Sequence, residues 1–298
     1  MRISDNAIDE WAEHGYVIVP DFLTSSDIDA AMENAGRYFP TWDEYAAAPE
    51  RYPWTPQSHL LRYDGDVHYR EAPYCGDALN NLATHPELID FAKRALTTDR
   101  VMLTQSLLWP KYAGTTNFEQ ELHMDYGDNS LVVPTTAREF SQLAVIIYLT
   151  DVTIDLGPTY VVPFAESKGR PVTPYDRSRE LDPELYENES PVLVKAGTIL
   201  AFHSRTFHRG SRMTATEGAR FTQHLVFRNA GSEWMTWRGW SKYATTAEMA
   251  HFMVQASPEQ REVIGFPPVG HSYWNDETIS GVAERYPGID MAPYRRGA

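Results

Sequence analysis

Two segments of the 298-residue chain carry histidines where they could bind a metal ion. In ELHMDYGD, His123 and Asp125 lie two residues apart, and in AFHSRTFHRG two more histidines follow, His203 and His208. Two imidazoles and one carboxylate that leave other coordination positions open are the ligands with which non-haem iron(II) centres bind dioxygen and a cosubstrate. The residue types therefore indicate a candidate metal site assembled from both segments.

The pair His123 and Asp125 has little weight without its context. Ten histidines and 41 acidic residues in 298 positions give roughly 1.4 such pairs by chance. A second pair, His85 and Glu87, begins an apolar run with Pro86 at its first helical position, and we interpret it as a helix start. The metal hypothesis therefore needs the second segment and a nearby arginine, whose guanidinium could pair with the far carboxylate of an oxo-diacid.

The N-terminal third of the chain has a mainly helical pattern. Residues 4–36 predict a helix, a strand and a helix, with Gly15 ending the first helix and Ser25 or Ser26 capping the second. Residues 84–97 predict a further helix. The Pro- and aromatic-rich stretch between these elements, residues 40–78, has no clean period and is expected to be irregular.

From Val101 onward the pattern changes to strands. No helix-length segment alternates with the strand-like runs in the βαβ manner, so we expect an antiparallel sandwich or barrel. The runs are β-branched and aromatic and are bounded by Gly, Pro and Asp: RVMLTQSLLWPKY, SQLAVIIYLTDV, TYVVPF, VLVKAGTILAFHS and ARFTQHLVFRN.

Two long polar stretches interrupt the strands, at residues 126–140 and 165–190. Stretches of this length in a compact domain are either functional lids or solvated insertions, and we expect lids because both adjoin the candidate site. The whole chain is expected to be one domain, residues 1–298, with helical and irregular N-terminal support at 1–100, a β-barrel core at 101–230 and a C-terminal extension at 231–298.

Composition limits the classes of function. The formal net charge of −15 disfavours nucleic acid as a partner, because a negative surface repels phosphate backbones. No apolar run approaches ~18 residues, so we expect no membrane span, and we expect no signal peptide because the N-terminus lacks an apolar core. Cys75 is the only cysteine, which excludes an internal disulfide and fits a cytoplasmic location. We interpret Cys75 as an ordinary small side chain, and some of the aromatic residues as the lining of a small-molecule pocket.

The order of these blocks resembles the phytanoyl-CoA dioxygenase family of iron(II)/2-oxoglutarate-dependent oxygenases. The resemblance extends to about residue 230 and rests on EHGYVIVPDFLTSSDI, TQSLLWPKYAG, LHMDYG, LAVIIYLTDVTIDLGPTYVVPFAESKG and KAGTILAFHSRTFHRGS. It implies a mainly β fold with flanking helices, the double-stranded β-helix or cupin-like jelly roll. It also implies a dioxygenase that uses Fe(2+), 2-oxoglutarate and dioxygen to hydroxylate a small organic substrate, releasing succinate and CO2.

The resemblance also assigns roles to residues. By position, it makes His123, Asp125 and His208 the iron ligands and Arg220 the anchor for the distal carboxylate of 2-oxoglutarate. Family members often carry a hydroxyl residue two positions after the distal histidine, where this chain has a glycine, and Arg220 lies one residue further along than usual. One extra residue in the turn explains both departures and makes Ser211 a second cosubstrate contact.

Two further residues precede the His-x-Asp motif in the region that forms part of the cosubstrate pocket in similar proteins. These are Gln105 and Lys111, and each is either a cosubstrate contact or an ordinary edge residue. Of the remaining histidines, His203 is separated from His208 by an odd number of residues, so strand alternation predicts opposite faces and one ligand only. His224 shares a face with Arg220 and lies either near substrate or in a hydrogen-bonded core.

Other functions remain open at this stage. The chain could be a metal-binding barrel without turnover, although a full ligand set with its arginine argues against it. A zinc-dependent hydrolase would leave Arg220 without a role. A halogenase is disfavoured, because chloride would need the place that Asp125 occupies. A lipid, an acid or a secondary metabolite would all suit as substrate, and the sequence leaves the oligomeric state open.

Overall fold

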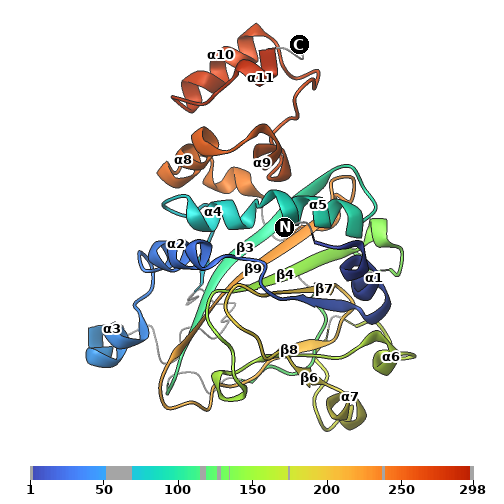
Figure 1. Cartoon of the computed structure of the whole chain (residues 1–298). Helices are drawn as coiled ribbons and strands as arrows, with labels where there is room; N and C mark the ends of the chain where they lie inside the picture. Colours follow the sequence, from blue (N-terminus) through green and yellow to red (C-terminus); the bar gives the residue numbers. More distant parts are fainter. Residues whose placement is uncertain are drawn as a thin grey trace.

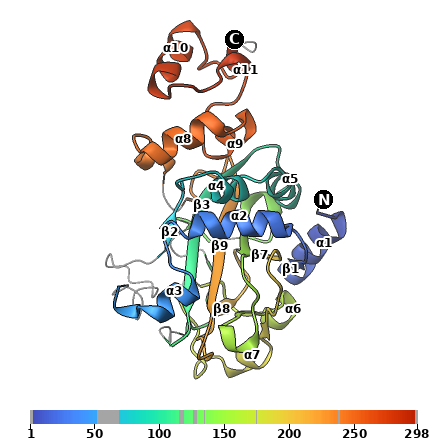
Figure 2. The same ribbon diagram turned by 60° about the vertical axis from the view of Figure 1, so that its left-hand side comes forward.

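The computed structural model describes residues 3–51, 69–114, 119–125, 129–133, 135–173, 175–236 and 239–295. Most helices lie at the N-terminal and C-terminal parts of the chain, and the strands lie between them (Figures 1 and 2). The α-helices are α1 (Asp5–His14), α2 (Ser25–Ala35), α3 (Trp42–Ala47), α4 (Ala78–Ala83), α5 (Pro86–Ala95), α6 (Phe164–Ser167), α7 (Pro183–Glu187), α8 (Ala247–Gln255), α9 (Pro258–Val263), α10 (Asp276–Arg285) and α11 (Ala292–Arg295). The strands are β1 (Tyr16–Val19), β2 (Arg70–Glu71), β3 (Val101–Tyr112), β4 (Gln142–Tyr148), β5 (Thr159–Val161), β6 (Ser190–Pro191), β7 (Ile199–His203), β8 (His208–Gly210) and β9 (Ala219–Asn229). The 3-10 helices in the described residues are η1 (Pro49–Arg51), η2 (Arg138–Phe140), η3 (Ile154–Leu156) and η4 (Trp240–Tyr243).

The predicted helix, strand and helix at the N-terminus are confirmed as α1, β1 and α2. Gly15 ends α1 with φ 83°, a left-handed conformation that glycine adopts without steric cost. The predicted cap of α2 at Ser25 or Ser26 is wrong, because the N-cap is Thr24. Thr24 and Asp27 form a reciprocal capping box, which satisfies two backbone N–H groups at once and fixes the helix start one residue earlier.

The strands form two antiparallel sheets among the described residues. The larger sheet has the order β1-β7-β4-β9-β3-β2, and the smaller has the order β6-β5-β8. All five predicted strand segments are confirmed, as β3, β4, β5, β7 and β9. The long pair β3 and β9 places Lys111 opposite Arg220 and Leu107 opposite His224, so these four side chains share one face of the sheet.

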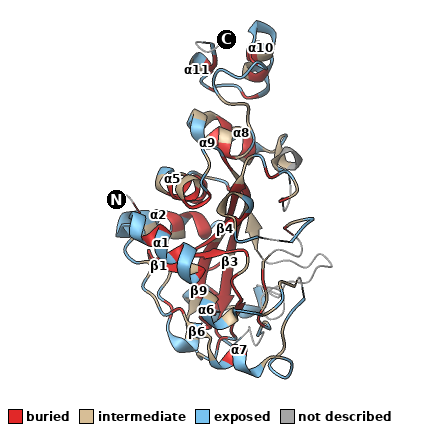
Figure 3. Ribbon diagram, turned by 90° about the vertical axis from the view of Figure 1, so that its right-hand side faces the viewer, coloured by how far each residue is buried: buried red, intermediate tan, exposed pale blue. Residues whose placement is uncertain are grey.

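Two apolar layers explain why the larger sheet is buried on both faces (Figure 3). On its outer face, Val145 and Leu225 pack with buried residues of α1, α2, α4 and α5, such as Trp11. On its inner face, Ile146 and Phe202 pack with Val161 of the small sheet and with their neighbours. Continuous burial explains the near-continuous apolar runs in the sequence, and the predicted mainly β fold with flanking helices is confirmed.

The two polar stretches differ in how they are held. Within 165–190, Arg170 forms a two-pronged ion pair with Asp182. Leu185 is fully buried in a cluster that includes Leu122, the residue before the candidate ligand His123. The described part of 126–140 is more exposed: Leu131 is 89% exposed. A lid role stays a prediction for both stretches.

The C-terminal extension forms α8 to α11 at one end of the larger sheet (Figure 1). It has an apolar cluster of its own around Phe252, Trp274 and Tyr294. Trp240 connects it to the core, since its indole N–H donates to the carbonyl of Leu103 on β3 at 2.7 Å. No helix in the described part of the chain is long and apolar enough to cross a membrane. The predicted division into a core and an extension within one domain stays a prediction.

Candidate metal centre and cosubstrate pocket

His123 and His208 face one another across a pair of backbone hydrogen bonds. The amide of each donates to the carbonyl of the other at 3.0 Å, which makes an isolated antiparallel bridge. Residues paired in this way project their side chains from the same face. Strand β8 is in turn fixed by β5, where Val161 lies opposite His208. The backbone therefore positions both imidazoles before any ligand binds.

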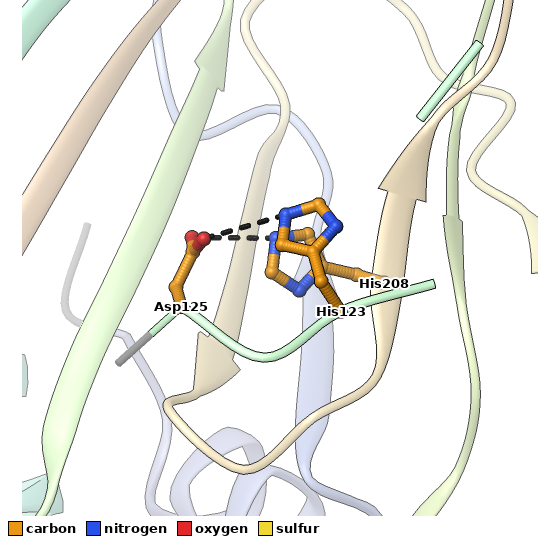
Figure 4. Close-up of side chains that lie close together, drawn as sticks. All are labelled: His123, Asp125 and His208. Carbon is orange, nitrogen blue, oxygen red and sulfur yellow. Dashed lines mark ion pairs between the residues drawn. The ribbon is translucent and has the colours of Figure 1, made fainter. Parts of the chain in front are cut away.

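Asp125 completes the group from two residues beyond His123 (Figure 4). Its Oδ1 lies 3.5 Å from Nε2 of His123, and its Oδ2 lies 3.3 Å from Nε2 of His208. The three ligand atoms all lie within 4.8 Å of one another. Two ligands bonded to one ion at ~2.1 Å and at right angles lie roughly 3.0 Å apart. The observed spacing therefore fits a single metal ion after a small inward movement.

Backbone carbonyls orient the two rings. Nδ1 of His123 lies 2.8 Å from the carbonyl oxygen of Glu121, and Nδ1 of His208 lies 3.0 Å from that of Thr206. A ring nitrogen beside a carbonyl carries a proton, so in the neutral ring Nε2 is left free to bind a metal ion; when Nε2 also takes up a proton, it donates to Asp125. Two neutral imidazoles and one carboxylate suit iron(II) and leave other positions for exogenous ligands.

The pKa shifts of Asp125 and His123 indicate that a metal ion would displace protons from this site. Burial alone would raise the pKa of Asp125, but the charge of His208 and hydrogen bonds from both histidines hold that pKa well below its usual value. Burial would lower the pKa of His123, but its hydrogen bond and attraction to Asp125 outweigh burial and raise that pKa. Protons therefore compete with a metal ion for this site. The Asp125 side chain is 36% exposed, so the site is open on that side.

A second feature of the inner face is a pair of buried cations. Lys111 and Arg220 lie opposite each other on β3 and β9 and are 6% and 5% exposed. Arg220 donates from Nη1 to the carbonyl of Gly157, and among the described residues its Nε has no partner. Lys111 donates from Nζ to the carbonyl of Ser211 at 3.0 Å. Neither cation forms an ion pair with a carboxylate of the described residues.

The pKa values of both cations respond to this environment. Burial lowers the pKa of Arg220, and burial together with the charge of Arg220 lowers the pKa of Lys111 well below its ordinary value. Two buried cations with no counter-ion are costly unless an anion joins them. The pair is therefore a candidate site for a carboxylate ligand.

The turn before β5 fixes the carbonyl that positions Arg220. Gly157 adopts φ 66°, and a Cβ at this position would lie 2.8 Å from the carbonyl oxygen of Ser211. Gly157 belongs to the Gly-Pro block of the sequence, but sequence reasoning assigned no role to it and did not predict its contact with Arg220. The Ser211 hydroxyl donates to the carbonyl of Pro158 at 2.7 Å. Its predicted contact with cosubstrate stays a prediction, and in the structure its carbonyl holds Lys111 instead.

Gln105 lies on the same face of β3 but at a distance from the cation pair. It is opposite Val226, six residues and therefore about 20 Å along the strand from Lys111. It cannot join Arg220 in holding one carboxylate. A contact between Gln105 and cosubstrate stays a prediction, and it would have to involve a part of 2-oxoglutarate other than the carboxylate that Arg220 binds.

His203 lies on the outer side of the sheet. Its Nε2 is 2.7 Å from the Ser141 hydroxyl, and its ring packs against Trp11 and Phe164. Burial lowers its pKa to about 3, so it is a neutral core residue. The predicted separation from His208 is correct, but the reason differs, because the two histidines end β7 and begin β8 instead of sharing one strand.

His224 is on the inner face, as expected. Its Nε2 lies 3.0 Å from the Thr222 hydroxyl, and its ring packs on Trp109 at 5.4 Å. Burial, then the charge of Arg220, lowers its pKa to about 3.

One supporting residue had no sequence signal. The Tyr186 hydroxyl of α7 accepts a hydrogen bond from the amide of Leu122 at 3.0 Å and donates to the carbonyl of Arg177 at 2.6 Å. The carbonyl of Leu122 accepts from the amide of Arg177 at 2.8 Å. The stretch 165–190 therefore supports the backbone next to His123, a role that only the folded chain reveals.

The pattern of this site agrees with a comparison against protein-family models. Residues 11–221 match the model of the phytanoyl-CoA dioxygenase (PhyH) family. The chain belongs to this family. The match contains all three members of the candidate metal group and the cation pair. A comparison with curated proteins found no match.

Three solved structures with a similar fold are distant in sequence. The carbocyclase SnoK of nogalamycin biosynthesis, described as non-haem and alpha-ketoglutarate-dependent, is 21% identical with a TM-score of 0.56, over 76% of this chain and 85% of that one. EctD from S. alaskensis is 19% identical with a TM-score of 0.58, over 77% and 78%. HygX from Streptomyces hygroscopicus, with nickel, 2-oxoglutarate and hygromycin B bound, is 16% identical with a TM-score of 0.54, over 83% and 94%. These similarities show that the fold is shared.

Proposed function

We propose that this member of the phytanoyl-CoA dioxygenase family is an iron(II)- and 2-oxoglutarate-dependent oxygenase that hydroxylates a small organic molecule. The single observation that carries the proposal is the cation pair Lys111 and Arg220, which is buried on the inner face of the sheet with no counter-ion among the residues that the structure describes. A dicarboxylate cosubstrate supplies the missing negative charge. The nearby group of His123, Asp125 and His208 supplies the ligand set for the metal.

Each residue has a distinct task in this proposal. His123, Asp125 and His208 would hold iron(II) through Nε2, a carboxylate oxygen and Nε2. Bound iron(II) and 2-oxoglutarate would supply the oxidising chemistry, in which dioxygen is consumed and succinate and CO2 are released. Arg220 would donate two parallel hydrogen bonds to the far carboxylate, because a guanidinium matches the geometry of a carboxylate. Lys111 would add a second charge to the same carboxylate.

The open side of the metal group gives the substrate a route of approach. Asp125 is the most exposed of the three ligands, and both histidines are more enclosed.

The neighbours of similar fold include an enzyme described as a carbocyclase and one described as an epimerase. We propose hydroxylation as the reaction, and we further propose a cytoplasmic location, where a reducing environment suits both Cys75 and iron(II).

Two other functions give the cation pair no task. A barrel that only stores or senses metal has no need of a buried lysine and arginine, and a zinc hydrolase would use water as its remaining ligand. The presence of Asp125 also argues against halide binding in its place.

The proposal is tested by measuring succinate. Purified protein is incubated in air with iron(II), 2-oxoglutarate and a library of small acids, lipids and secondary metabolites. We expect slow succinate release without substrate, a marked increase with a true substrate, and none in Asp125→Ala. Product analysis by mass spectrometry should show a gain of one oxygen atom. A protein that binds iron but releases no succinate under any condition would point to the binding function instead.

A further inference from the structure

A large cavity lies outside the metal group and the cation pair. It has a volume of about 580 Å³. It lies between the first residues of β3, the end of β9, and the helices α8 to α10 with the segments that connect them. This is the end of the sheet that the C-terminal extension covers (Figures 1 and 3). Ligand pockets typically occupy about 300–1,000 Å³. The described residues that line this cavity include none of His123, Asp125 and His208.

The walls of the cavity are mainly apolar. Aromatic and thioether side chains such as Met102, Trp240, Met253, Phe266 and Tyr286 line it. A surface of this kind favours an aliphatic or aromatic ligand body, since rings and sulfur adapt to varied apolar shapes.

Arg228 places a buried positive charge in this apolar surrounding. It is 9% exposed, and its Nη1 donates to the carbonyls of Asn229 and Ala230, both at 2.8 Å. Among the described residues its Nε has no partner, and no carboxylate forms an ion pair with it. Glu233 contributes only a longer-range attraction. Arg228 lines the cavity, and a buried guanidinium with no carboxylate partner in the described part of the chain is suited to a carboxylate ligand.

The charge around the cavity is opposite to that of the whole protein. The chain carries −15, yet its described lining residues include two arginines, Arg228 and Arg285, and no Asp or Glu. Arg285 is exposed at the mouth, with its guanidinium 5.5 Å from the Tyr286 ring centre. An anionic ligand is therefore attracted at the mouth and again in the interior.

We propose that this cavity binds an amphipathic carboxylic acid, with its apolar body between β3 and the C-terminal helices and its carboxylate on Arg228. The site is separate from the cosubstrate pocket. Arg228 follows Arg220 by eight residues on β9, which places the two about 26 Å apart along the strand. The proposal does not depend on the proposed oxygenase function, because it rests on the cavity and its charge alone.

Calorimetric titration of the metal-free protein tests the proposal, with 4-phenylbutanoate as the acid probe and 4-phenylbutan-1-ol as its uncharged match. We expect the acid to bind at least about tenfold more tightly than the alcohol, as a charged hydrogen bond to a buried arginine implies. Arg228→Met should remove this preference and leave alcohol binding unchanged. Arg228→Gln should give the same result. It retains a polar side chain at this position and serves as the test if Arg228→Met destabilises the protein.

Two further variants separate this cavity from the cosubstrate pocket. Arg220→Met removes the other buried arginine and should leave the preference for the acid intact. Ala244→Phe adds a ring to the cavity wall and should weaken both probes, while thermal melting confirms that the protein is folded. Equal binding of acid and alcohol to the wild type, or a preference that survives in both Arg228 variants, would overturn the proposal. Loss of the preference in Arg220→Met would do so too.

Discussion

Arg220→Lys should weaken the binding of 2-oxoglutarate by roughly 30-fold or more. In the wild type Arg220 is 5% exposed, its Nε has no partner among the described residues, and its guanidinium is oriented by the carbonyl of Gly157. It can therefore form two parallel charged hydrogen bonds with a carboxylate. Lysine keeps the charge but cannot form the two-pronged pair. Disturbing one partner of a buried charge pair costs on the order of 2–5 kcal/mol, and 2 kcal/mol at 1.4 kcal/mol per decade is about 30-fold.

The assay is calorimetric titration of 2-oxoglutarate into protein loaded with manganese(II), which avoids turnover. Metal affinity should change little in Arg220→Lys, because the arginine is not part of the metal group. The matched control is Arg228→Lys, a buried arginine on the same face of the same strand, which should leave 2-oxoglutarate binding close to wild type. An unchanged dissociation constant in Arg220→Lys, or an equal loss in both variants, would refute the assignment of the cosubstrate anchor.

Three other predictions follow from the same geometry. His208→Ala should abolish tight iron binding, whereas His203→Ala should keep the metal and lower only the melting temperature; metal analysis after gel filtration decides, and the reverse pattern would contradict the assignment. The affinity for 2-oxoglutarate should fall as pH rises through the lowered pKa of Lys111, because a bound carboxylate favours the charged lysine and binding takes up a proton. Titrations from neutral to alkaline pH should show this dependence in the wild type and a flatter one in Lys111→Met. Gly157→Ala should weaken 2-oxoglutarate binding through a clash with the carbonyl oxygen of Ser211, whereas Gly169→Ala, with a similar φ but open space around it, should not; equal effects in both would show that backbone strain alone is responsible.

Much of the fold could be predicted because local patterns and tertiary burial agree. The β-branched runs from Val101 to Asn229 are buried on both faces, so their continuous apolar character predicted strands directly. The predicted cap of α2 differs by one residue from the observed one. Three hydroxyl residues in a row compete for it, and both Thr24 and Ser26 have an aspartate three positions later, so the local pattern does not choose between them. In the structure Thr24 forms the capping box, with Asp27. Helix α4 was missed, since ALNNLA is too short to show a period and depends on Asn34 and Asn80 for its position.

The candidate site was predictable to the extent that residue type and order carry it. His123, Asp125 and His208 came from two segments in the expected order, and the structure brings them within 4.8 Å. The sequence could not show how deeply each side chain is buried. From sequence alone, Lys111 is equally well interpreted as an edge residue or as a cosubstrate contact. Its burial opposite Arg220 in the structure favours the second interpretation. The supporting hydroxyl of Tyr186 depends on α7 packing beneath Leu122, a long-range contact with no local pattern.

One chain is proposed to bind one iron(II) and one 2-oxoglutarate at adjoining sites. Anaerobic titration of 2-oxoglutarate into the iron(II)-loaded protein, followed in the visible spectrum, tests it most directly. We expect a metal-to-ligand charge-transfer band that appears only when both are present, saturates at one equivalent and is lost in His208→Ala. Absence of this band in protein shown by metal analysis to hold stoichiometric iron would contradict the account and favour a function without 2-oxoglutarate.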